Sequence, residues 1–488
     1  MELQESILKE AARKLDISPS DFKRAQDRFN AVRSWLENGS YNSGEEPDIY
    51  LQGSFRLGTV VRPYRGDKDG DFDIDQVCEI RKPISPNNPA TLKNDIGDRL
   101  KENADYLRIL DDEGKRCWTL KYASDGNRPG FHLDVLPALH SNLDQQHQID
   151  ITDKNSANYT WSKSNPRGYY YWFKSRNPIS SEEQEVARAN IYQENEDIYQ
   201  HPDDVPKRLV RSNLQRALQL MKRHRDVKFA MMDRKPISII ITTIAAHVFE
   251  RSDIVEILYD FTSYVLTRFE DFIRYGHLDN DGVLFHEDGN WVIPNPTNAE
   301  ENFAEKWNTD REFPMEFFSW VSQLHRDLHA FVSSGVLDDF NLRSASAGTG
   351  DSYITLMKNK VNEEIDSNLL NSTNFLSLIH LAIDGKINWE EVQQLAQSTF
   401  DKAEDEGSKD ISKVNFYQIA KHRGKNLSDE AAQDLRQVLK RNQESSAFVM
   451  CCNLILGTAT PNMIRDCLSQ DVLHWPILRL ANSEHLFP

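Results

Sequence analysis

The sequence predicts an α+β fold in which a mixed sheet with helices is followed by a helical lobe and a C-terminal helical extension. The first half alternates segments of period two, rich in β-branched and aromatic residues, with segments of helical period. From about Glu182 onward the apolar residues recur almost entirely at helical spacing. The chain of 488 residues exceeds one typical domain, so roughly two to four domains are expected.

Shifts in this pattern divide the chain into three parts. We expect a core with an N-terminal spine helix in residues 1–185, a helical lobe in 186–340 and a helical extension of unassigned role in 341–488. The small residues of 344–352, "SASAGTGDS", indicate a linker or mobile loop at the start of the extension.

The elements of the core are predicted in order from caps and alternation. Ser18 or Ser20 caps a helix that ends at Gly39. A short strand then runs into a turn at Gly53 and Ser54, followed by a helical turn that Pro63 stops. The remaining elements are strands and an amphipathic helix, expected at 71–80, 117–123 and 131–139 for the strands and at 95–110 for the helix.

Capping residues predict several helices of the second half. Pro236 is a favourable first residue for a strongly apolar helix. Asn388 and Ser428 are expected to cap two helices of the extension.

Three acids, Asp71, Asp73 and Asp75, alternate with apolar residues in "DFDIDQVCEI". In a strand, period two places all three carboxylates on one face. Taken alone, such a strand is more often a solvated sheet edge. Here Asp134 lies between apolar residues of a second expected strand, "FHLDVLPAL", so two strands can bring carboxylates together.

Carboxylates without His or Cys ligands suit hard divalent cations, Mg²⁺ or alternatively Mn²⁺. Two such ions about 3.5–4 Å apart hold a triphosphate and activate an attacking hydroxyl. Gly53 and Ser54, about twenty residues upstream of the acids, can hold phosphate at a strand-to-helix turn. The sequence therefore predicts a nucleotide site built on metal-bound acids.

The totals exclude several classes of protein. The formal net charge of −18 argues against a protein that coats long nucleic acid. No apolar run approaches the roughly 18–20 residues that span a bilayer, and the five cysteines form no CxxC pair, so we expect a reduced, cytoplasmic protein without membrane contact. The basic residues between Lys207 and Lys235 are interpreted as one solvated helix face in preference to a substrate patch.

The segments "LQGSF", "FDIDQV" and "HLDVL" match the motif pattern of the polymerase-beta-like nucleotidyltransferases. With "SNPRGYYYWF", "LQRALQLMKRHRD", "KPISIIITT" and "NPTNAEENFAEKW", the chain resembles the cGAS/DncV-like nucleotidyltransferases (CD-NTases) of bacterial anti-phage CBASS operons. The resemblance covers roughly residues 15–335. It implies the two-lobed polymerase-beta-like fold, with the helical lobe closing the active-site cleft.

The resemblance also implies roles for individual residues. Asp73 and Asp75 would ligate the catalytic metals, and Asp134 would ligate one metal and help to deprotonate the attacking hydroxyl. The triphosphate would be held by four further residues, namely Gly53, Ser54, Lys222 and Ser238. Asp71 stays open between a charge outside the metal shell and the turn before the strand.

Other notable residues are expected to be structural. Tyr169 to Phe173 are interpreted as core between the lobes in preference to a base-stacking surface. His224 and His247 are expected to be packed or solvent-facing rather than catalytic. Asn302 and Trp307 are expected to be structurally placed, and the pair Cys451 and Cys452 to lie in core.

The expected function is nucleotidyl transfer that joins nucleoside triphosphates into a cyclic di- or trinucleotide second messenger for anti-phage defence. Three alternatives remain open: linear oligonucleotide synthesis, which includes DNA and protein priming; nucleotide transfer to a protein or tRNA; and a non-enzymatic scaffold, which the presence of all three acids argues against. The expected partners are nucleoside triphosphates and an operon-encoded effector or regulator that meets the C-terminal extension.

Overall fold

The computed structural model describes most of the chain, and the following applies to these residues. They are 2–62, 64–65, 68–83, 88–125, 128–141, 147–156, 158–230, 232–250, 253–335, 337–340, 361, 373–443, 446–470 and 475–483. The linker expected at 344–352 lies outside the described residues.

The described elements alternate in the first third of the chain and are mainly helical afterwards. The strands are β1 (Asp48–Gln52), β2 (Tyr64–Arg65), β3 (Lys68–Asp69), β4 (Phe72–Ile80), β5 (Trp118–Tyr122), β6 (Phe131–His140), β7 (Ile149–Asn155), β8 (Asn158–Ser164), β9 (Phe285–Glu287), β10 (Asn290–Val292), β11 (Pro294–Asn295) and β12 (Asn298–Asn302). The α-helices of the first 340 residues are α1 (Glu2–Lys14), α2 (Pro19–Glu37), α3 (Gly53–Leu57), α4 (Pro89–Lys101), α5 (Ala104–Ile109), α6 (Pro166–Arg176), α7 (Ser181–Gln193), α8 (Asn213–Lys228), α9 (Ser238–Val248), α10 (Ile254–Tyr275) and α11 (Glu312–Ser334). Those of the extension are α13 (Thr373–Ile383), α14 (Trp389–Lys402), α15 (Glu406–His422), α16 (Asp429–Arg441), α17 (Ser446–Leu456), α18 (Pro461–Gln470) and α19 (Trp475–Ser483).

The central sheet has six strands in the order β1-β4-β6-β7-β8, and β5 also pairs with β6. β4 and β6 are parallel, whereas the other pairs of this sheet are antiparallel. Because β4 occupies one edge of β6, β5 and β7 share the other edge, each along a different half of the strand. The expected mixed sheet is confirmed.

The two faces of β4 have different neighbours. Phe72, Ile74 and Cys78 are buried in a core that also contains Phe22 and Phe29 of α2 and Leu92 and Ile96 of α4. The opposite face carries Asp73 and Asp75 and then Val77, which belongs to a smaller apolar cluster. Alternation along the strand therefore hides one face under helices and leaves the acids on the other.

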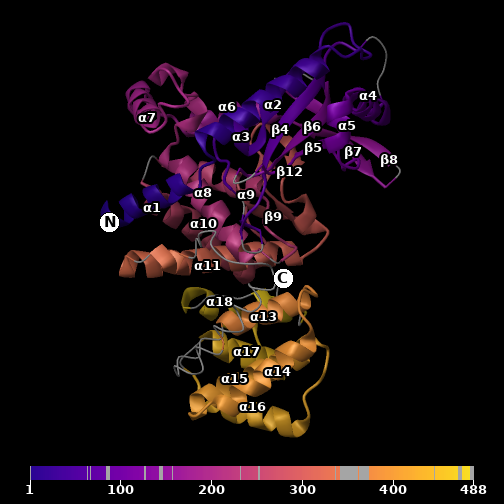
Figure 1. Ribbon diagram of the computed structural model, residues 1–488. Helices are drawn as coiled ribbons and strands as arrows, with labels where there is room; N and C mark the ends of the chain where they lie inside the picture. The colour runs from indigo at the N-terminus through magenta and orange to yellow at the C-terminus, as the bar shows by residue number, and fades with distance from the viewer. Residues whose placement is uncertain are drawn as a thin grey trace.

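The helical lobe lies below the sheet in Figure 1, with α8, α10 and α11 in the middle of the molecule. The first helix, α1, packs on this lobe, although the sequence assigns its residues to the core. Leu8 and Ala12 of α1 join the lobe's apolar cluster, and Glu5 Oε2 accepts hydrogen bonds from the backbone N–H groups of Ile254 and Val255 at the start of α10. The spine of the core itself is α2, capped by Ser18 as expected.

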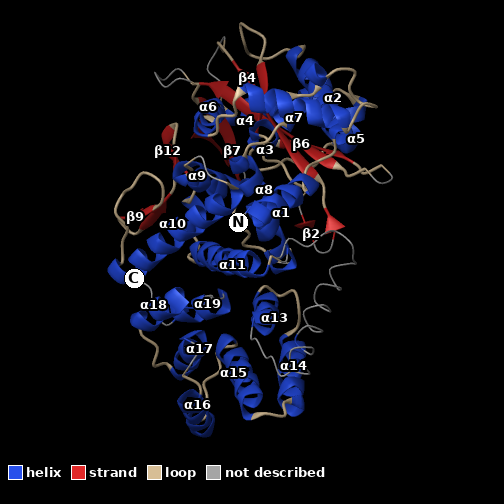
Figure 2. Ribbon diagram, turned by 90° about the vertical axis from the view of Figure 1, so that its left-hand side faces the viewer, coloured by secondary structure: helices blue, strands red, loops and turns tan. Residues whose placement is uncertain are grey.

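The extension forms a helical layer beneath α11, as Figures 1 and 2 show. Buried residues of α13, α17 and α19 belong to the same apolar cluster as those of α8 and α11. The predicted caps Asn388 and Ser428 are both present, and Cys451 and Cys452 are buried. Within the described ranges, no helix combines the length and the apolar character that crossing a membrane requires.

The described structure corrects three details of the sequence-based elements. β7 and β8 extend the sheet, and the four short strands β9 to β12 interrupt a region expected to be almost wholly helical. The helix expected to start at Pro236 begins at Ser238. The turn α3 ends at Gly58, which adopts a left-handed conformation, before Pro63 is reached.

Candidate active site

The turn at Gly53 joins the sheet to the candidate site. β1 ends at Gln52, which lies opposite Asp75 of β4, and Gly53 then adopts a φ of +63° as α3 begins. A Cβ atom at residue 53 would lie 2.0 Å from Oδ2 of Asp75. Both the positive φ and this close approach require glycine. The chain therefore brings the backbone of the Gly53–Ser54 turn directly against one of the predicted metal ligands.

The register of β4 and β6 brings together acids from distant parts of the sequence. Asp75 is the direct partner of Asp134, and Asp73 is the partner of His132. Because the strands are parallel, register partners project from the same face of the sheet. The sequence-predicted acids Asp73, Asp75 and Asp134 therefore lie on one face of two adjacent strands.

The carboxylates of this face perturb one another. Burial, followed by the nearby charges of Asp134 and Asp73, raises the pKa of Asp75 to about 8. Burial also raises the pKa of Asp134, although the Thr119 hydroxyl, which donates to its Oδ1 at 2.5 Å, acts in the opposite direction. A raised pKa means that the ionised forms are disfavoured in the protein alone. A bound cation would reverse this effect.

A cavity of about 280 Å³ lies between this face and the helical lobe. Four of the sequence-predicted residues line it, namely Ser54, Asp73, Lys222 and Ser238. Two of them come from the sheet domain and two from the lobe, so the cavity exists only because the two parts meet. The structure thus unites residues that lie up to 184 positions apart, from Ser54 to Ser238.

The lobe side of the small cavity is a buried ionic network. The Lys222 ammonium donates to the Thr59 carbonyl at 3.0 Å and to its hydroxyl at 2.8 Å. Burial, with Arg225 nearby, lowers the pKa of Lys222 to about 7. Arg225 pairs with Asp226 at 2.7 Å and donates to Ser238 Oγ at 2.8 Å. The network fixes cationic groups beside the Gly53–Ser54 turn, where an anion is favoured.

The interpretation of this basic stretch as a solvated helix face is wrong. Lys222, Arg223 and Arg225 expose 3%, 2% and 5% of their surface. A helix with charges on all sides is usually solvated, but here the sheet domain covers one side of α8 and the lobe covers the other.

A second cavity, of about 1000 Å³, opens on the other side of the turn. Gly53 and Asp75 line it together with Arg56 and Tyr170, and the Arg56 guanidinium lies over the Tyr170 ring at 4.2 Å from the centroid. Ile237 lines both cavities, so they adjoin at this residue. The size of this second cavity and its aromatic and polar lining suit a nucleoside.

The chemistry of the three acids suits a divalent cation, although their carboxylates do not all face the same cavity. Asp73 faces the small cavity and Asp75 the large one, whereas Asp134 is not among the described residues lining either. In the part of the chain that the structure describes, no three Asp, Glu, His or Cys side chains are close enough to hold one ion as they stand. Carboxylate oxygens are ligands that Mg²⁺ or Mn²⁺ prefers, and a bound cation would offset the burial and the nearby negative charges that raise the pKa values of Asp75 and Asp134.

Asp71 belongs to a different environment. It precedes β4, its Oδ2 lies 3.7 Å from Nε2 of His132, and its Oδ1 lies 2.6 Å from the position of a Cβ on Gly130. His132 also places Nδ1 3.3 Å from Oδ1 of Asp73. Asp71 therefore neighbours the site through His132 and is separated from the cavities.

The residues expected to be structural are placed as follows. Tyr169 and Phe173 are buried in core as expected, whereas Tyr170 lines the large cavity and Tyr171 is 53% exposed. His224 is buried and its Nε2 lies 2.9 Å from Oδ2 of Asp327. Asn302 lines the large cavity, and Trp307 packs in the core.

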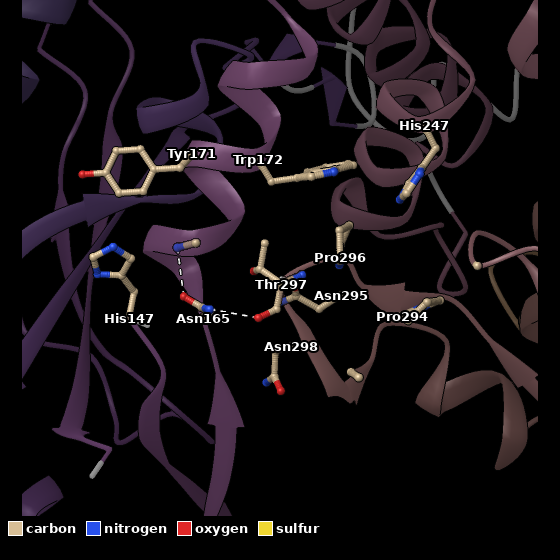
Figure 3. A pocket seen from close by; sticks show the side chains of 13 residues that line it. His147, Asn165, Tyr171, Trp172, His247, Pro294, Asn295, Pro296, Thr297 and Asn298 are labelled. Atoms are coloured by element: carbon tan, nitrogen blue, oxygen red, sulfur yellow. Dashed lines mark hydrogen bonds between the residues drawn. The ribbon is translucent and has the colours of Figure 1, made fainter. Parts of the chain in front are cut away.

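A third cavity, of about 1180 Å³, lies on the far side of α6 and contains none of the three acids among its described lining (Figure 3). Asn165 spans it by accepting from the backbone N–H of Gly168 at 2.9 Å and donating to the Thr297 carbonyl at 2.9 Å. Tyr171 and His147 face each other at one end, and Trp172 and His247 at the other (Figure 3). His247 is thus packed against an aromatic ring, away from the acids.

Sequence reasoning missed three residues of the site, namely Thr59, Arg225 and Asp226. Thr59 carries no sequence signal, because it acts through its backbone carbonyl and hydroxyl. Arg225 and Asp226 follow Lys222 in "MKRHRD", and a charge run in the middle of a helix with buried apolar neighbours was the available signal.

Comparison with known proteins finds relatives of one kind. The model of the Second Messenger Oligonucleotide or Dinucleotide Synthetase domain matches residues 1–177. A c-di-GMP synthase of Roseivirga ehrenbergii is 28% identical over 72% of this chain and 86% of its own, and the cyclic dinucleotide synthase CdnG of Bradyrhizobium diazoefficiens is 26% identical over 62% and 70%. The structure of the Bradyrhizobium CD-NTase CdnG in complex with GTP shares the fold with a TM-score of 0.56 and 22% identity, over 70% of this chain and 94% of that one. The chain therefore resembles the CD-NTase nucleotidyltransferases in sequence and shares their polymerase-beta-like fold, as the motifs in its sequence predicted.

Proposed function

We propose that this protein joins nucleoside triphosphates into a cyclic di- or trinucleotide at the face formed by Asp73, Asp75 and Asp134. The observation that carries the proposal is the turn at Gly53 and Ser54, which adjoins Asp75 and separates a small cavity, lined by basic and acidic side chains, from a large one. The small cavity suits phosphates and the large one a second nucleoside. The relatives named as cyclic dinucleotide synthases support the same product class.

In this scheme the chain's own residues position the substrates. Lys222 and Ser238 hold phosphate from the lobe, and the Gly53–Ser54 turn holds it from the sheet. Asp73, Asp75 and Asp134 would hold divalent cations, Mg²⁺ or Mn²⁺, which supply charge neutralisation and lower the pKa of a bound hydroxyl. Asp134, whose pKa is raised by burial, is suited to accept the proton of the attacking 3′- or 2′-hydroxyl.

The reaction then forms a bond from this hydroxyl oxygen to the α-phosphorus and breaks the bond to the leaving pyrophosphate. Repeating the transfer within the linear product closes the ring. Catalysis in this scheme is positioning and electrostatic stabilisation, without a covalent enzyme intermediate.

The test is an assay of products with each labelled NTP and dNTP in Mg²⁺ or Mn²⁺, resolved by mass spectrometry. We expect a small, phosphatase-resistant product from NTPs. A ladder of linear products, or label that remains on the protein, would contradict cyclisation and support the alternatives of polymerisation or protein modification.

We further propose that the product signals to an effector in an anti-phage system inside the cell. The support is the resemblance of the motifs to nucleotidyltransferases of such operons. Expression of the whole operon should protect cells from phage, and the Asp75→Asn variant should remove the protection while leaving protein levels unchanged.

Proton uptake tests the role of Lys222. Its pKa of about 7 leaves it mostly neutral at pH 8, and an adjacent triphosphate would raise this pKa. Binding of a non-hydrolysable NTP without metal should therefore take up as much as about one proton at pH 8 and weaken as pH rises from 7 to 9. Calorimetry in buffers of different ionisation enthalpy measures the uptake.

The matched variant is Lys222→Met, which keeps the buried aliphatic stem and removes the ammonium. Its proton uptake should be smaller than that of the wild type. Equal uptake by the two proteins would show that Lys222 does not face the phosphates.

A further inference from the structure

The segment between α8 and α9, taken with the first residue of α9, contacts both the small cavity and the C-terminal extension. Its later part, residues 235–238, lines the small cavity. Its earlier residues, Asp233 and Arg234, contact the extension instead. We call residues 232–238 the shared loop.

The turn between α13 and α14 of the extension forms ion pairs with the shared loop. The Lys386 ammonium donates to Oδ1 of Asp233 at 2.9 Å. Nη1 of Arg234 lies 3.5 Å from Oδ1 of Asp384, whose side chain is only 3% exposed. Two charged pairs of opposite polarity therefore link the loop to the extension.

The turn that carries Asp384 and Lys386 is itself well fixed. Gly385 closes α13 with a φ of +68°. Its N–H donates to the Ala382 carbonyl at 3.1 Å, and the N–H of Lys386 donates to the Leu381 carbonyl at 2.8 Å. This helix-ending arrangement satisfies backbone groups at the end of α13, and the charged side chains of Asp384 and Lys386 reach the loop from it.

Arg234 of the shared loop also pairs with acids near and on α11. Arg234 pairs with Asp310 at 3.2 Å and with Glu312 of α11 at 3.0 Å, and Arg479 of α19 reaches the same Glu312 at 3.0 Å. Buried residues of α11, α13 and α19 form one apolar cluster beneath these pairs. The extension is therefore anchored to the lobe and bound to the shared loop.

On the cavity side, the shared loop is part of the ionic network. Lys235 lies 3.3 Å from Asp226, and Arg225 donates to the Pro236 carbonyl at 3.0 Å and to Ser238 Oγ at 2.8 Å. A displacement of Asp233 and Arg234 would move these groups away from the position where phosphate binds.

We propose that Asp384 and Lys386 of the extension are positioning residues for nucleotide binding, acting through the shared loop. The inference rests on the proposed function, because it takes the small cavity to hold the substrate's phosphates. It assigns the extension a role within the enzyme's own reaction, in addition to any contact it makes with a partner.

The experiment reverses charges, because removing an exposed ion pair alone has little effect. Lys386→Asp should repel Asp233, and the double variant Asp233→Lys/Lys386→Asp should restore the attraction. The control is Lys413→Asp, which breaks another 2.9 Å pair of the extension, with Asp434, away from the loop. The exposures of the two lysines, 32% and 25%, are similar.

We expect Lys386→Asp to raise the KM for NTP by about three- to tenfold with kcat within about twofold, since it weakens substrate and transition-state binding together. The double variant should return to within about twofold of wild type, and the control should not change. An unchanged KM in Lys386→Asp, or a double variant that stays impaired, overturns the proposal.

Hydrogen exchange of the protein without nucleotide separates this inference from the proposed function. Amides of residues 232–238 should exchange faster in Lys386→Asp than in Lys413→Asp. If they do so while the wild type makes no nucleotide product, the proposed function is wrong, but the Lys386–Asp233 pair still holds the shared loop. Unchanged exchange in Lys386→Asp would show that this pair does not hold the loop.

Discussion

Replacing Asp75 by Asn should reduce nucleotidyl transfer by at least about a hundredfold, because the variant loses a ligand charge that neither Asp73 nor Asp134 can replace. The side chain keeps its shape, and its carboxylate is already disfavoured by burial at a pKa of about 8. The fold should therefore be kept or slightly stabilised. The measurement is the initial rate of pyrophosphate release, with the melting temperature recorded alongside.

The matched control is Asp71→Asn, which removes a carboxylate two positions before Asp73, just ahead of β4. Asp71 lies 3.7 Å from His132 and is not among the described residues that line either cavity, so its variant should keep activity within about tenfold. Equal losses in the two variants would show that the transfer site is placed wrongly on this strand.

Replacing Gly53 by Ala should abolish most activity through geometry alone, without removing any charge. A Cβ at this position would meet the Asp75 carboxylate at 2.0 Å, so the turn or the acid must move. Displacements of this size cost about a hundredfold in rate when they separate reacting groups. The positive φ adds about 1–2 kcal/mol of destabilisation.

Gly289→Ala separates these two effects. Gly289 has a φ of +77°, and a Cβ there would meet nothing within 4 Å. This variant should lose a similar free energy of unfolding, measured by denaturant titration, and keep full activity. If both variants lose activity equally, general destabilisation explains the result and the close approach of Gly53 to Asp75 does not matter.

The sequence predicted the acid face because period two along a strand is a local property. Asp73 and Asp75 lie on the face of β4 opposite Phe72 and Ile74, and Asp134 has the same parity on β6. The pairing of Asp75 with Asp134 follows from strand register, which depends on how the whole sheet folds. The sequence could therefore predict that the acids share a face, but it could not predict that Asp73 and Asp75 line different cavities.

Burial of charge was the weakest part of the sequence-based prediction. Lys222 and Arg225 are in a stretch whose composition is typical of a solvated helix, and only the packing of the sheet domain and the lobe around α8 buries them. The short strands β9 to β12 are two to five residues long, too short for a periodic pattern to appear. The hydrogen bond from Lys386 to Asp233 joins residues 153 positions apart, so no local sequence pattern predicts it.

The central claim is that the acids of two adjacent strands hold divalent cations beside the Gly53–Ser54 turn. The most direct measurement is the number of Mn²⁺ ions bound per chain with a non-hydrolysable NTP, determined by electron paramagnetic resonance for the wild type, Asp71→Asn and Asp73→Asn/Asp75→Asn. We predict about two tightly bound ions for the wild type and for Asp71→Asn, and none beyond those held by the nucleotide alone for the double variant. The same number of protein-bound ions in the double variant and in the wild type would contradict the claim.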